Sequence, residues 1–159
     1  MNSNNRIQEL VEKLQLLPHP EGGFYKETYR SEQTTLNGSR NLMTSIYFLL
    51  TGTNFSRFHR IKSDEAWYFH EGTSLIVHEL SEKGYSQTKL GLDFSKGEVP
   101  FHIVKSEVIF GSSVSEEEGY ALVSCTVAPG VDFQDFDLFD TETLLNQYPE
   151  HEEIIRKLS

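Results

Sequence analysis

Short segments with the period of a β-strand follow one another along most of this chain and limit what it can fold into. Apolar and polar residues alternate from Ser56 to Ile61, and aromatic residues dominate from Ala66 to His70. Turns separate these segments from further strand-like ones, which span residues 24–30, 43–50, 73–80, 85–92, 100–104 and 119–127. Many short strands at regular spacing, with few helices among them, predict an antiparallel sandwich or barrel.

Helical patterns are confined to the two ends of the chain. Residues 5–17 carry apolar side chains at the spacing of an amphipathic helix, which Pro18 ends. At the other end Asp140 is a good N-cap for a helix over residues 141–147, and Pro149 can open a second short helix. We expect one domain over 1–159, with an N-terminal helical segment over 1–18, a β-rich body over 19–139 and helices over 140–159.

Charge and composition exclude several classes of partner. The formal net charge of −10 argues against nucleic acid and against anionic membranes, because both require a basic surface. No apolar run approaches the roughly 18 residues that a membrane-spanning helix needs. Cys125 has no second cysteine to pair with, so a cytoplasmic location is expected.

The stretch from Gly52 to Gly72 carries the best candidate for a reactive site. A polar turn over residues 62–64 separates its two strand-like halves and predicts a hairpin. In such a hairpin His59 lies near the end of one strand and Glu65 at the start of the next. An imidazole and a carboxylate brought together in an aromatic cavity predict a metal site or an acid–base site.

The same stretch resembles the first cupin motif, in which His-x-His and a following glutamate stand between two glycines. Gly52, His59, Glu65 and Gly72 fit that frame, but Ile61 stands where the second histidine belongs. Three segments narrow the resemblance to the small cupins of cupin family 5, also called DUF985. They are HPEGGFYKETYRS over residues 19–31, KSDEAWYFHEG over 62–72 and GYALVSCTVAPGVDFQDFDLF over 119–139.

This resemblance implies an all-β cupin fold of the RmlC-like type, a double-stranded β-helix or jelly roll, and a homodimer. Residues 105–113 occupy the second cupin motif, where Phe110 stands at the position of the histidine ligand. Two of the four usual metal ligands are therefore missing, at Ile61 and Phe110. His59 and Glu65 are metal ligands only if a metal is present, and a tightly held transition metal needs at least three protein ligands. We expect no cofactor, with a divalent metal as the less favoured alternative.

Strand alternation and the motif positions predict which side chains join His59 and Glu65 in a ligand pocket. The candidate ligand-binding residues of this kind are Arg57, Trp67, Phe69, Phe110 and, if its register allows, Tyr47. An aromatic pocket with an imidazole, a carboxylate and a guanidinium suits a small polar, anionic or ring-shaped molecule.

Residues 19–31 leave two interpretations open. Glu21, Gly22 and Gly23 form a turn, and a strand follows from Phe24 to Arg30. In one interpretation this is an edge strand whose Glu27 and Arg30 are solvated. In the other, His19, Glu21, Glu27 or Arg30 lie at the mouth of the cavity, so Glu27 and Arg30 are kept as candidate ligand-binding residues.

Three functional classes follow. The first is a metal-independent isomerase or epimerase of a sugar-like substrate, with His59 as a base polarised by Glu65. The second is a non-catalytic protein that binds a small molecule in the same pocket. The third, disfavoured by the missing ligands, is a metal-dependent oxygenase or isomerase that uses His59, Glu65 and water. A second titratable group across the pocket from His59 favours the enzyme, and an all-aromatic opposite wall favours the binding protein.

Overall fold

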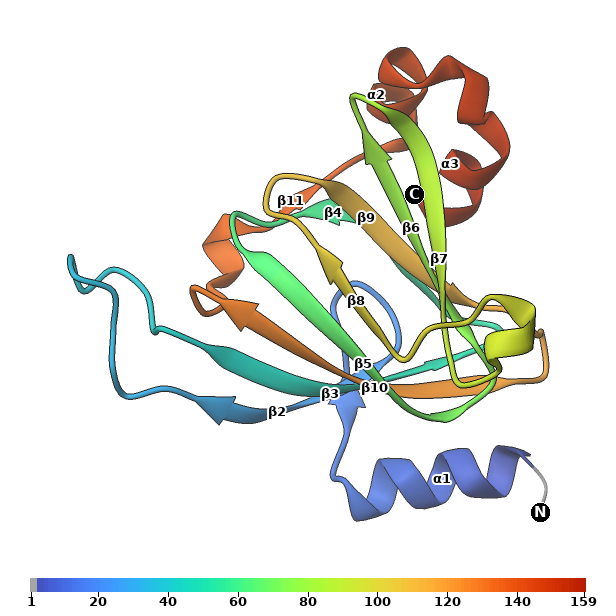
Figure 1. The fold of residues 1–159 in the computed structure, drawn as a ribbon, viewed down its shortest axis with the longest axis horizontal. Coiled ribbons are helices and arrows are strands. Elements are labelled where there is room, and N and C mark those ends of the chain that lie inside the picture. The colour runs from blue at the N-terminus through green and yellow to red at the C-terminus, as the bar shows by residue number, and fades with distance from the viewer. Residues whose placement is uncertain (1–2) are drawn as a thin grey trace.

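Two facing β-sheets form the body of the protein, as Figure 1 shows for the computed structural model, which describes residues 3–159. The strands are β1 Leu17–Pro18, β2 Phe24–Arg30, β3 Thr44–Thr51, β4 Phe55–Arg60, β5 Asp64–Gly72, β6 Leu75–Ser81, β7 Gly84–Leu90, β8 Phe101–Val104, β9 Ile109–Val114, β10 Tyr120–Ala128 and β11 Asp137–Leu138. One sheet has the order β1-β2-β3-β10-β5-β8 and the other β11-β4-β9-β6-β7. The predicted all-β jelly roll is confirmed.

The predicted hairpin between residues 56–61 and 66–70 is wrong. β4 pairs with β9 and β11 in the five-stranded sheet, whereas β5 pairs with β10 and β8 in the six-stranded sheet. The intervening turn therefore carries the chain from one sheet to the other, and Ile61 at this corner is buried in the core between them. His59 and Glu65 consequently lie on different walls of the molecule's interior.

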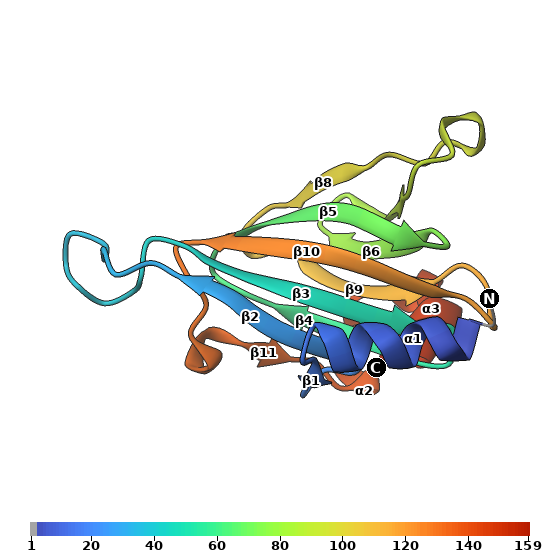
Figure 2. The same cartoon turned by 90° about the horizontal axis from the view of Figure 1, so that it is seen from below.

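The helices cover the outer faces of the two sheets. α1 (Ser3–Lys13) lies along the six-stranded sheet, as Figures 1 and 2 show. Its Leu10 packs with Leu49 and Leu122. Residues 1 and 2 of the expected helical segment lie outside the described residues. α2 (Thr141–Gln147) and α3 (Glu152–Leu158) pack on the five-stranded sheet. Among residues 3–159 there is no helix with the length and apolar character needed to cross a membrane.

The predicted N-cap of α2 is present in the structure. The backbone N–H of Thr143 donates a hydrogen bond to the Asp140 carboxylate at 2.7 Å. This contact satisfies one of the first amides of the helix, which have no partner within the helix itself. The helix that it starts buries Leu144 against Phe58 of β4, on the side of that strand opposite to the interior.

Candidate functional site

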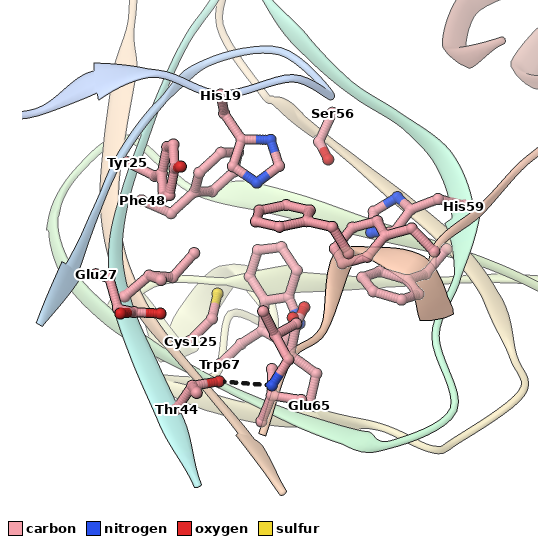
Figure 3. Close-up of a pocket in the computed structure, with 16 residues that line it drawn as sticks. His19, Tyr25, Glu27, Thr44, Phe48, Ser56, His59, Glu65, Trp67 and Cys125 are labelled. Atoms are coloured by element: carbon pink, nitrogen blue, oxygen red, sulfur yellow. Dashed lines mark hydrogen bonds between the residues drawn. The ribbon is translucent and has the colours of Figure 1, made fainter. Parts of the chain in front are cut away.

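A cavity of about 300 Å³ opens between the two sheets and is shown in Figure 3. The six-stranded sheet supplies most of its wall, through residues of β2, β3, β5 and β10, and the five-stranded sheet supplies residues of β4 and β9. The lining side chains are His19, Tyr25, Glu27, Thr44, Ile46, Phe48, Ser56, His59, Glu65, Trp67, Phe110, Cys125, Val127, Val131, Phe133 and Phe136. Most of the wall is therefore apolar or aromatic, with a few polar groups that can orient a ligand.

His59 is held in one tautomer by the backbone of its own strand. Its Nδ1 lies 2.7 Å from the carbonyl oxygen of Arg57, and because a carbonyl only accepts, Nδ1 must carry the proton. The ring stacks parallel to Phe136, with centroids 5.4 Å apart, and touches Phe110 at 4.3 Å. Burial lowers the pKa of His59 to about 4. At neutral pH the imidazole is therefore uncharged, with a lone pair on Nε2.

Glu65 contributes a carboxyl group from the opposite sheet, at the start of β5. Burial raises its pKa to about 8, and the nearby Trp67 indole offsets this shift only in part. At neutral pH the group is therefore protonated and can donate its O–H into the cavity.

His19 enters the cavity from the turn before β2, as the second interpretation of residues 19–31 expected. The backbone N–H of Glu21 donates to its Nδ1 at 2.9 Å, so the neutral ring carries its proton on Nε2. Burial first, and the His59 imidazole second, lower the pKa of His19 to about 4. Gly22 lets this turn sit directly on β4, because a Cβ there would lie 1.9 Å from the carbonyl oxygen of Phe55.

Arg57 does not lie beside His59 as expected, because β4 contains a β-bulge. The pairing of β4 with β9 shifts between Ser56 and His59, so both of these side chains line the cavity. Simple alternation would have placed Arg57 beside His59, but Arg57 is exposed and Phe58 packs under the C-terminal helices. The cavity therefore lacks the guanidinium that the sequence predicted.

Tyr47 and Phe69 also lie outside the cavity. Tyr47 points to the other face of β3 and packs near α1, because its neighbours Ile46 and Phe48 both turn inward. Phe69 packs against the core cluster between the sheets without lining the cavity. Tyr47 departs from the prediction because of the strand's register, whereas Phe69 faces inward as alternation predicted but lies in the packed core beyond the cavity.

The remaining predicted residues lie in or beside the cavity. Trp67 and Phe110 line its interior, and Glu27 lines it from β2. Arg30 does not line it and instead donates to the Glu27 carboxylate at 2.7 Å and to the carbonyl oxygen of Val131. Both Glu27 and Arg30 are exposed, as in the first interpretation, and Glu27 in addition lines the cavity, as in the second.

The segment after β10 supplies three lining residues, Val131, Phe133 and Phe136, that were not among the predicted site residues. A bidentate contact from Arg40 to Asp135, with both N···O distances at 2.7 Å, holds this segment against the loop between β2 and β3. The amide of Val131 is tied to the Thr44 hydroxyl at 2.9 Å, which is the dashed line in Figure 3. The three-residue spacing of these phenylalanines was the sequence signal that could have identified them.

Comparison with known proteins identifies the family. A family model described as the cupin superfamily, DUF985, matches residues 8–139. The chain belongs to this family. It is 32% identical over 146 residues to an uncharacterized protein of Saccharomyces cerevisiae, a match that covers 81% of this chain and 73% of that protein.

Solved structures place this DUF985 protein among cupins at two levels of similarity. A crystal structure of a Shewanella oneidensis protein matches with a TM-score of 0.90 and 46% identity over 96% of both chains. A hypothetical protein from Leishmania major matches with a TM-score of 0.89 and 36% identity, over 96% of this chain and 97% of that one. Oxalate decarboxylase of Bacillus subtilis shares the fold. It matches with a TM-score of 0.57 and 19% identity, over 89% of this chain and 36% of that one.

The usual cupin metal does not fit the donor atoms of this DUF985 protein. Phe110, which is 1% exposed, occupies the position of a histidine ligand and packs against the His59 ring. Ile61 occupies another ligand position and is buried in the core. Residues 3–159 contain no group of three or more His, Cys, Asp or Glu side chains that could hold a metal ion. Cys125 faces the cavity, but burial raises the pKa of its thiol, so it stays protonated.

Proposed function

We propose that this cupin is a metal-independent isomerase or epimerase that moves a proton next to the carbonyl group of a small, ring-shaped, sugar-like substrate. One observation carries the proposal, namely that two groups of opposite character share one cavity. His59 is a neutral base with a free Nε2, and Glu65 is a protonated acid on the other sheet. Environments that separate two titratable groups in this way assign the roles of base and acid.

The reaction follows from these two protonation states. Nε2 of His59 takes the proton from the carbon beside the carbonyl, and the electrons of that C–H bond form the C=C bond of an enol. The carbonyl oxygen receives the proton of Glu65 as its C=O bond becomes single. For an isomer, protonated His59 gives its proton to the neighbouring carbon, while the Glu65 carboxylate takes the proton of the hydroxyl on the first carbon as the new C=O bond forms. For an epimer, solvent supplies a proton to the opposite face of the original carbon, the Glu65 carboxylate takes back the enol O–H proton, and His59 releases its proton to solvent. The aromatic walls stack on the ring and exclude water.

The composition of the opposite wall supports catalysis over simple binding. An all-aromatic wall facing His59 would have favoured a binding protein, but the cavity contains Glu65 and His19 in addition to its aromatic rings. If the deuterium-exchange experiment below detects no exchange, the alternative of a non-catalytic protein that binds a small molecule is favoured instead.

The rate of proton exchange between substrate and solvent should depend on pH with a bell-shaped profile. The base is lost as pH falls through the His59 pKa of about 4, and the acid is lost as pH rises through the Glu65 pKa of about 8. We expect deuterium to enter the carbon beside the carbonyl of small cyclic ketones and ketoses in D₂O, with a plateau between these limits. Proton NMR of each compound with and without the protein measures the rate. A rate that keeps rising above pH 8, or no exchange with any compound, would contradict the proposal.

We also infer a homodimer that forms through the free edge of β8. β8 is the last strand of the six-stranded sheet, and its Phe101 and Ile103 are 46% and 37% exposed, next to Tyr68 at 43% on β5. An antiparallel edge strand can pair with its own copy about a two-fold axis. Sedimentation equilibrium should give twice the mass of 18.3 kDa for the native protein and the monomer mass for Phe101→Glu/Ile103→Glu. Leu36→Glu, in an exposed loop, should stay dimeric; a monomeric native protein would refute the dimer.

A further inference from the structure

We propose that the cavity selects uncharged ligands, and that Trp67 and His19 determine this specificity by each offering an N–H group to an oxygen atom of the ligand. The proposal rests on the function proposed above for the location of the site, and it narrows the class of substrate. The substrate would be a neutral ring that carries carbonyl or hydroxyl oxygens. Sugar phosphates, sugar nucleotides and carboxylated sugars would be excluded.

Among the described residues that line the cavity there is no lysine or arginine that could compensate an anionic ligand. Both of its histidines are neutral at pH 7, because burial holds the pKa of His19 and of His59 near 4. Arg57, the cation expected here, is exposed instead. An anion moved from water into such a wall loses its hydration without gaining a counter-charge, which is strongly unfavourable.

Two arginines near the cavity are already paired with carboxylates of the protein. Arg30 is held by Glu27 at 2.7 Å, and Arg40 is held by Asp135 in a bidentate contact. A ligand anion would have to displace one of these carboxylates. The formal net charge of −10 also repels anions on their approach.

A cationic ligand would find no free carboxylate among the described residues that line the cavity. Glu65 is protonated, since burial raises its pKa to about 8, and the Glu27 carboxylate is occupied by Arg30. The polar groups that remain are hydrogen-bonding groups without net charge. They match a neutral ligand, whose burial requires only that its oxygen atoms find donors.

Two N–H donors in the cavity wall have a spare hydrogen bond to give. Trp67 is 3% exposed, and its Nε1 makes no hydrogen bond of normal geometry within the described part of the chain, although the Glu65 carboxyl lies near enough for the indole to lower its pKa. Buried donors are almost always paired in native proteins, so an unpaired one in a cavity wall points to a partner supplied by the ligand. His19 presents the second donor at Nε2, because its Nδ1 accepts from Glu21. Figure 3 shows the two side chains on different sides of the cavity.

The charge selectivity can be tested with two rings, each in three charge states. The probes are D-glucose, D-glucuronate and D-glucosamine, together with benzamide, benzoate and benzylamine. Saturation-transfer NMR and thermal shifts at pH 7 measure binding to the full chain. We expect the neutral member of at least one set to bind, with its charged relatives at least tenfold weaker. A charged member that binds as tightly as its neutral relative overturns the proposal.

Two conservative variants test the donors. Trp67→Phe keeps an aromatic ring and removes the indole N–H. His19→Asn keeps an acceptor for the amide of Glu21 and removes the donor at the position of Nε2. Each should weaken benzamide about threefold to tenfold, the effect of one neutral hydrogen bond, and leave toluene, which has no acceptor, unchanged. Tyr68→Phe, exposed on the same strand, is the control. Equal weakening of benzamide and toluene would show that the residue acts only through packing and would overturn its assignment.

The binding and deuterium-exchange measurements test the charge selectivity and the proposed isomerase independently. Binding of neutral probes without deuterium exchange would refute the isomerase and leave the selectivity standing. Deuterium exchange together with tight binding of glucuronate or benzoate would refute the selectivity and leave the isomerase standing. Failure of all six probes to bind would refute the selectivity, and the exchange measurement would then decide the function separately.

Discussion

Replacing Glu65 with glutamine should make the protein more stable, and the gain should grow with pH. Burial raises the pKa of Glu65 to about 8 in the native state, whereas the unfolded chain releases this proton near the ordinary glutamate pKa of 4.5. Between these values the unfolded state binds fewer protons, so the free energy of unfolding falls as pH rises. Glutamine has nearly the same shape and does not titrate. We expect Glu65→Gln to gain roughly 4 kcal/mol at pH 8 and almost nothing at pH 4.5.

Urea unfolding at several pH values checks this expectation. Glu116→Gln, on an exposed acidic loop, is the matched control and should show no comparable pH-dependent gain. A Glu65→Gln protein that is less stable than the native protein at pH 8 would mean that Glu65 is ionised and stabilised in the native state, against the role proposed here.

The same substitution should remove the acid of the reaction. Glutamine can donate a hydrogen bond but cannot transfer a proton to the carbonyl oxygen, and a general acid contributes on the order of 10²- to 10⁴-fold to a rate. We therefore expect deuterium exchange to fall by at least about 100-fold while stability rises. This opposition of stability and activity is typical of a functional group that is held in an unfavourable environment.

Replacing His59 with asparagine should abolish exchange and leave the fold intact. The Asn side chain can still donate to the carbonyl oxygen of Arg57, as Nδ1 does now at 2.7 Å, but it has no basic nitrogen at the position of Nε2. We expect a loss of at least about 100-fold in the deuterium exchange rate. His59→Ala is a poorer test, because it also opens a void beside Phe110 and Phe136.

His70→Asn provides the control for this experiment. His70 lies on β5 but is exposed and hydrogen-bonded to Ser124, so its replacement should leave the exchange rate unchanged. Circular dichroism and thermal unfolding establish whether the His59→Asn protein is folded. An unfolded variant would identify His59 as a core residue, and a folded variant with full exchange would exclude it as the base.

Several features of this protein could be read from local sequence because they depend on neighbours only a few residues away. Period-two alternation identifies strands, and the Asp140 side chain meets an amide three residues further on, so α2 was predicted with its observed bounds. The spacing of the cupin motif likewise indicated His59, Glu65 and the positions where ligands are missing, at Ile61 and Phe110. All of these are properties of a short stretch of chain.

Strand pairing, the lining of the cavity and the charge states of its residues were decided by the tertiary structure, because they depend on residues far apart in sequence. Alternation does not say which strand β4 pairs with, so the switch between sheets and the bulge that turns Arg57 outward were invisible in the sequence. His19 and Phe136 reach His59 only through the closure of the jelly roll. The charge states of His59 and Glu65 depend on desolvation by both sheets together, and those states are what make one of them a base and the other an acid.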